Sequence, residues 1–159
     1  MLLAIYLNDH LAAATAAHDL AKRAAGSNRD TEYGPFLELL AIEIEEDRES
    51  LLEIMRGLEI GVDRLKVLGG WWAEKLGRFK LNGRLVGYSP LSRVVELEVL
   101  SLGVSGKVAL WRTLERLEPE HPVLVDFEVG QLARRAERQL QEIEAHRVQA
   151  VADAFAPGT

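Results

Sequence analysis

Cysteine is absent from the 159-residue chain, and its absence excludes several classes of protein. A chain without thiols forms no disulfide, no thiolate zinc site, no iron–sulfur cluster and no cysteine nucleophile. Disulfide-stapled secreted scaffolds are therefore excluded. The composition is compatible with a reducing compartment, and we expect a cytoplasmic protein.

A long uncharged apolar run is also missing. The first residues are apolar, but Asn8, Asp9 and His10 interrupt them well before the roughly 20 residues that cross a bilayer. This start also lacks the basic region of an export signal. The sequence predicts a core helix here and no transmembrane segment.

Strand patterns are almost absent, with a short stretch at 81–88 as the one candidate. The fold class predicted is therefore all-α, with four long helices in one domain over 1–159. Gly26 and Pro119 indicate helix ends, while Pro35 and Pro90 suit first helical turns. The predicted helices cover about 2–25, 35–60, 90–117 and 127–155, with Ser89 and Asp126 as N-caps of the last two.

Equal helix lengths and short first and third connections predict an up-down four-helix bundle. The connection 61–89 is long enough to cross the bundle and is itself partly helical, whereas 156–159 is a frayed tail. Gly103 and Gly106 do not have the spacing of a phosphate-binding loop. We expect them to allow close helix contact or to kink the helix, with Lys107 outside the bundle.

Each predicted helix carries an ionisable residue on its apolar stripe. On the third helix, the predicted inward stripe is Leu91, Val95, Glu98, Leu102, Gly106, Leu110 and Thr113. Buried charges cost several kcal/mol apiece unless they are paired, so we expect these residues to meet. The predicted buried polar network is His18, Glu43, Asp47, Glu98 and Arg147.

Four helices with inward carboxylates resemble the ferritin-like superfamily, in which such residues hold a di-iron or di-manganese centre. That family needs Glu-x-x-His on two helices. Here the second helix has Glu43-Ile44-Glu45-Glu46, and the fourth has Ile143-Glu144-Ala145-His146. The resemblance therefore implies the layout, and the metal motifs are not intact.

Two interpretations of the network remain open. In the first, Arg147 joins Asp47 and Glu98 through bidentate hydrogen bonds, and no cofactor is bound, because a guanidinium repels a divalent cation. In the alternative, the protein is a metal-binding protein or oxidoreductase that holds Fe or Mn. Its ligands would be Glu43, Asp47, Glu98, Glu142 and His146.

Residues 63–84 form a basic segment, with two acidic and six basic residues in a chain of net charge −6. The acidic total argues against nucleic-acid binding in general. We expect the segment to pair with the acidic first two helices; alternatively, it forms an anion-facing patch on membranes or single-stranded nucleic acid. That patch would be Trp71, Trp72, Lys75, Arg78, Lys80 and Arg84.

No motif identifies a reaction, so the leading hypothesis is a non-enzymatic interaction or scaffold protein. The alanine-rich stretch 11–17 offers small side chains on more than one face of the first helix. Small side chains permit close helix contacts beyond the bundle, so we expect a homodimer.

Overall fold

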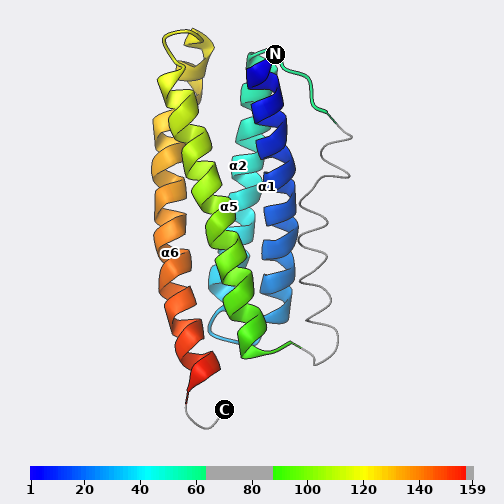
Figure 1. Cartoon of the computed structure of the whole chain (residues 1–159), viewed down its shortest axis with the longest axis vertical. Helices are drawn as coiled ribbons and strands as arrows, with labels where there is room; N and C mark the ends of the chain where they lie inside the picture. Colours follow the sequence, from blue (N-terminus) through cyan, green and yellow to red (C-terminus); the bar gives the residue numbers. More distant parts are fainter. Residues whose placement is uncertain (64–87, 157–159) are drawn as a thin grey trace.

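The computed structural model describes residues 1–63 and 88–156, and over these ranges the chain is helical with no strand. This confirms the all-α prediction for the described residues. Four long helices lie side by side in Figure 1, and a short 3-10 helix, η1, precedes the last. The elements are α1 (Leu2–Ser27), α2 (Gly34–Gly57), α5 (Pro90–Arg116), η1 (Pro122–Phe127) and α6 (Val129–Phe155).

Two apolar clusters define how the helices run. One cluster joins Leu7 at the start of α1 to Ile54 near the end of α2 and Ala133 near the start of α6. The other joins Ala24 near the end of α1 to Leu37 near the start of α2, together with the first half of α5 and the second half of α6. Consequently α1 and α6 run in one direction, and α2 and α5 run in the other.

The chain leaves α2 and enters α5 at opposite ends of the helices. After α2, the Asn8 side chain donates to the Gly61 carbonyl at 3.0 Å and accepts from the Asp63 backbone N–H at 2.6 Å. Before α5, Tyr88 lies beside Asn28 at the far end of α1. The predicted crossover falls largely on residues 64–87, which lie outside the described residues, as does the possible strand at 81–88.

The predicted helix boundaries are confirmed at α5 and corrected at α6. The Ser89 hydroxyl accepts from the Ser92 backbone N–H at 3.2 Å, as expected of an N-cap. Asp126, in contrast, lies inside η1 and caps nothing. The chain reverses instead through Glu128, whose φ of 48° and ψ of 47° place it in the left-handed region, and α6 begins one residue later.

The inward stripe predicted for the third helix is wrong except at Leu110, which is buried. Leu102 on that stripe is 71% exposed, and Leu91 and Glu98 are also exposed, whereas Trp111 is 1% exposed. This helix carries apolar side chains on two faces, so periodicity alone does not choose between them. Burial of the largest side chain, Trp111, sets the orientation that the structure adopts. The residues buried on α5 are Val94, Leu97, Leu100, Val104, Leu110, Trp111 and Leu114.

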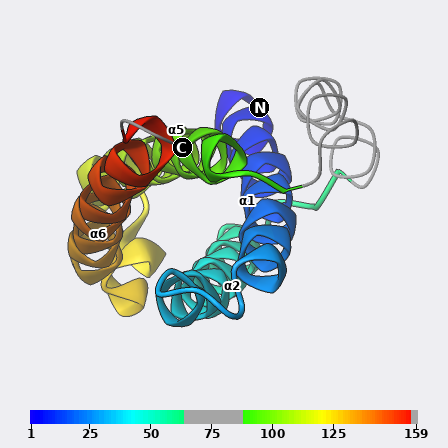
Figure 2. The ribbon, with the colours of Figure 1, turned by 90° about the horizontal axis from the view of Figure 1, so that it is seen from below.

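Viewed along the helices, the order around a common axis is α2, α1, α5 and α6 (Figure 2), and η1, which precedes α6, contacts α2. Among the described residues, no helix has the length and apolar character needed to cross a membrane.

Candidate functional site

A buried carboxylate, Asp47 on α2, is the centre of the main polar cluster. Its side chain is 2% exposed. Oδ1 accepts from Arg135 Nε at 2.9 Å and from Arg135 Nη2. Oδ2 accepts from Lys107 Nζ and from Gln139 Nε2 at 3.2 Å. Four donors match the roughly four lone-pair positions of a carboxylate, so Asp47 is saturated.

The remaining members of the cluster are held by the same groups. Gln139 Oε1 accepts from Lys107 at 2.5 Å, and Gln139 Nε2 donates to Glu43 at 2.9 Å. We call Glu43, Asp47, Lys107, Arg135 and Gln139 the Asp47 cluster. Its members come from α2, α5 and α6, so the cluster joins three helices across the interior. Because its central polar groups are paired, burying them does not leave an uncompensated charge.

The two cations differ in their surroundings. Burial lowers the pKa of Lys107, because desolvation penalises the ammonium, while the neighbouring Asp47 carboxylate opposes this effect. Arg135 reaches further outward, and its Nη1 donates to the exposed Glu46 at 3.0 Å. Lys107 is therefore the interior cation of the cluster, and its predicted place outside the bundle is corrected.

The structure does not place Arg147 in the buried network, and this corrects the sequence prediction. Its Nε and Nη2 each donate to Glu144 at 2.7 Å, and its Nη1 lies 3.8 Å from Glu98. Both carboxylates are about half exposed, so this is a surface arrangement. The physical reason is the orientation of α5, which turns Glu98 outward.

His18 also lies apart from Asp47. Its Nδ1 is 3.2 Å from Glu45, which in turn accepts two hydrogen bonds from Arg48 at 2.7 and 2.6 Å. Of the five residues predicted for the network, Asp47 and Glu43 therefore belong to the Asp47 cluster. His18, Glu98 and Arg147 belong to two other groups of ion pairs.

The residues of the alternative metal site are not brought together either. His146 stacks on Phe36 with ring centroids 3.8 Å apart, and its Nδ1 lies 2.8 Å from the Glu142 carbonyl oxygen. The Glu142 side chain is exposed, as is Glu98. Within residues 1–63 and 88–156, no group of three or more histidine or carboxylate side chains is arranged to hold a metal ion.

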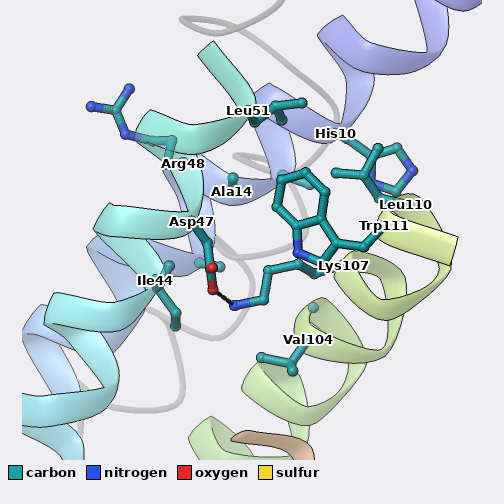
Figure 3. Close-up of a pocket in the computed structure, with 13 residues that line it drawn as sticks. His10, Ala14, Ile44, Asp47, Arg48, Leu51, Val104, Lys107, Leu110 and Trp111 are labelled. Carbon is teal, nitrogen blue, oxygen red and sulfur yellow. Dashed lines mark hydrogen bonds and ion pairs between the residues drawn. The ribbon is translucent and has the colours of Figure 1, made fainter. Parts of the chain in front are cut away.

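A pocket of about 40 Å³ lies beside the Asp47 cluster, between α1, α2 and α5 (Figure 3). Small and apolar side chains form most of its wall, with Ala13, Ala14 and Ala17 from α1. The alanine-rich stretch 11–17 of α1, which was predicted to form dimer contacts, thus lines a pocket between the helices. The polar lining residues are His10, Asp47, Arg48, Lys107 and Trp111.

One of these polar groups has no partner among the described residues. The indole Nε1 of Trp111 is buried and makes no hydrogen bond to residues 1–63 or 88–156. Leaving a buried donor unpaired costs about 1–3 kcal/mol, so native proteins rarely do so without a reason. In Figure 3 the indole nitrogen lies on the side of the ring that faces Lys107 and Asp47.

Four residues that matter here were missed from the sequence: Lys107, Trp111, Arg135 and Gln139. A signal was available, because Val104, Lys107, Trp111 and Leu114 recur at steps of three and four on α5. Anchoring the stripe on the tryptophan would have placed Lys107 inward. The basic patch of the alternative interpretation, with Trp71, Trp72, Lys75, Arg78, Lys80 and Arg84, lies outside the described residues.

Comparison with known proteins found no relative of the chain. No protein family, no curated protein and no solved structure matches the chain.

Proposed function

We propose that this chain is a non-enzymatic interaction or scaffold protein with a ferritin-like layout, in which an ion-paired cluster occupies the centre. Two antiparallel helix pairs, with the second and third long helices parallel, support this layout. The proposal assigns no catalytic residue, and its active surfaces are the outer faces of the helices.

The observation that carries the proposal is the saturation of Asp47. Its two oxygens accept from Lys107, Arg135 and Gln139, so the carboxylate has no lone pair to offer a metal ion. Two cations within hydrogen-bond distance of one carboxylate also repel a divalent ion placed there. The cluster acts as a structural element that fixes how α5 and α6 pack on α2.

Metal analysis tests this proposal. The full chain is expressed with iron and manganese available, purified without chelator and measured by mass spectrometry. We expect substoichiometric metal in the parent and in an Asp47→Asn variant alike. One or two metal ions per chain that disappear in the variant would overturn the proposal in favour of the metal-binding alternative.

We propose a second copy of the chain as the partner. Exposed apolar residues lie along the outer faces of two neighbouring helices, with Leu91 and Leu102 on α5 and Val148 and Phe155 on α6. The Arg147 and Glu98 ion pair joins these helices, so the patch carries both signs of charge. A patch with apolar and both charged groups is self-complementary about a two-fold axis.

A further inference from the structure

We propose that the pocket between α1, α2 and α5 is a binding site for a short-chain monocarboxylate, held by Trp111 and Lys107. This goes beyond the proposed function, because it concerns the interior of the molecule and does not depend on the outer patch. The proposal rests on the unpaired donors of two residues that line the pocket and on the size of its cavity.

Two residues that line the pocket have a hydrogen-bond donor to spare. Among the described residues, the buried Trp111 indole N–H has no partner. Lys107 has three ammonium protons, and the described residues take two of them, at Asp47 and Gln139. Since both groups are donors, their partner must be an acceptor. A carboxylate offers two oxygens, one for each donor.

The acceptors already present cannot use these donors. Asp47 lines the same pocket, but both of its oxygens are occupied. Arg48 also lines the pocket, but it is a donor, and it already donates two hydrogen bonds to Glu45. A hydroxyl ligand would use the free donors less well than a carboxylate, because it brings one oxygen and a proton that needs its own acceptor.

The charges of the Asp47 cluster are balanced. Asp47 and Glu43 carry two negative charges against the positive charges of Lys107 and Arg135, so the hydrogen-bond donors, and not a net positive charge, select the carboxylate. Glu46, which pairs with the outer side of Arg135, is 55% exposed and therefore better screened. Burial lowers the pKa of His10, so the imidazole is neutral at pH 7 and contributes no charge to this wall.

The cavity limits the size of the ligand. A volume of about 40 Å³ holds about three water-sized groups. The apolar wall, which includes Ile44, Leu51, Val104 and Leu110, is suited to a short alkyl chain. A carboxylate of two or three carbons comes nearest to both conditions.

Nuclear magnetic resonance titration of the full chain tests the proposal with sodium propionate, propionamide and propan-1-ol at constant ionic strength. The Trp111 indole signal, assigned by its loss in Trp111→Phe, reports the donor, and the methyl groups of Ile44 and Val104 report the pocket. We expect saturable shifts for propionate, with an affinity about tenfold tighter than for the isosteric amide, because the hydrogen bonds are charge-assisted.

Two variants locate the site. Trp111→Phe keeps an aromatic ring but removes the N–H, and we expect propionate to bind about fivefold more weakly. Ala14→Leu fills the pocket from α1 and should abolish saturable shifts while the helical circular dichroism is retained. The Ala14→Leu substitution leaves both donors in place, so the proposal stays testable if Trp111→Phe fails to fold.

Three results would overturn the proposal. The first is the absence of saturable shifts for propionate, which would leave water as the partner of Trp111. The second is equal affinity for all three probes, which would show that the carboxylate is not recognised. The third is unchanged propionate binding in a folded Ala14→Leu variant, which would place binding elsewhere. None of these depends on metal content or on the oligomeric state.

Discussion

At the scale of single residues, charge alone did not reveal which polar side chains are buried. Asp47 was predicted because its helix has one apolar face, and the structure buries it. Its partners were not predicted: Lys107 lies on the stripe of α5 that was placed outward, and Arg135 is a long side chain that reaches Asp47 from a partly exposed position. Arg147 has the same chemistry but pairs with Glu144 one turn away on its own helix. Periodicity locates the Cβ atom, whereas the end of a long side chain depends on its neighbours in space.

A tyrosine at the opposite end from η1 makes stability depend on pH. Burial raises the pKa of Tyr33 to about 12, and a hydrogen bond from its hydroxyl to Asp153 at 2.5 Å adds to the effect. The unfolded chain ionises this phenol near its ordinary pKa of 10.0, while the folded chain keeps it protonated. Between these two pKa values the unfolded state binds fewer protons, so stability falls as pH rises.

We therefore expect urea midpoints of the parent to fall between about pH 9.5 and 11.5, and to fall less in Tyr33→Phe. Burial also raises the pKa of Tyr88, so part of the loss remains in the variant. A Tyr33→Phe variant that loses stability as steeply as the parent over this range would show that Tyr33 ionises normally in the folded chain.

At the scale of helices, local signals predicted element type and most boundaries. As predicted, the first turns of α2 and α5 contain Pro35 and Pro90, and the N-cap of α5 is Ser89. The boundary at Asp126 was wrong because the chain reverses through a 3-10 turn and a left-handed Glu128, for which the sequence carries no glycine signal. The orientation of α5 was wrong because two of its faces are apolar. Local chemistry thus predicts where a helix begins, and tertiary packing decides which face is buried.

Two glycines give a matched test of helix packing. A Cβ on Gly34, at the start of α2, would lie 2.8 Å from the Asn28 carbonyl oxygen and 2.9 Å from that of Arg29. Both neighbours are backbone atoms that cannot move freely, so we expect Gly34→Ala to lower the free energy of unfolding by about 1–3 kcal/mol.

Gly106, within α5, provides the control, since a Cβ there meets no atom of the described residues within 4 Å. The close helix contact predicted at this glycine is therefore wrong. Gly106→Ala should stabilise the protein by up to about 1 kcal/mol, because alanine favours the helix. Urea denaturation of both variants measures the difference. Equal effects of the two substitutions would contradict the described turn between α1 and α2.

At the scale of the whole molecule, self-association is expected through the outer faces of α5 and α6. Leu102 is the most exposed leucine of this patch, at 71%, so Leu102→Asp should convert a dimer to a monomer. Leu39→Asp, at a 52% exposed position on α2, is the control and should leave the dimer intact. Sedimentation velocity at about 50 μM distinguishes these states, and a monomeric parent would remove the dimer proposal.

The basic segment remains a sequence-based hypothesis with its own test. If Lys75, Arg78, Lys80 and Arg84 pair with the acidic helices, changing all four to Gln should lower stability slightly, since exposed pairs contribute about 0–1 kcal/mol each. The parent should then show no salt-sensitive binding to anionic vesicles or single-stranded nucleic acid. Binding that weakens with salt and is lost in a folded quadruple variant would instead identify this segment as a functional surface.

The central claim is that Asp47 and Lys107 form a buried, energetically coupled pair. A double-mutant cycle in urea with Asp47→Asn, Lys107→Met and the double variant tests it most directly. Lys107→Met alone should cost about 2–3 kcal/mol, less than the full loss of a buried partner, because Arg135 still neutralises Asp47. The coupling should be about 1–3 kcal/mol. In the matched cycle with Arg147→Met in place of Lys107→Met, the coupling to Asp47 should be within error of zero. A negligible coupling for Lys107, or a larger one for Arg147, would contradict the account.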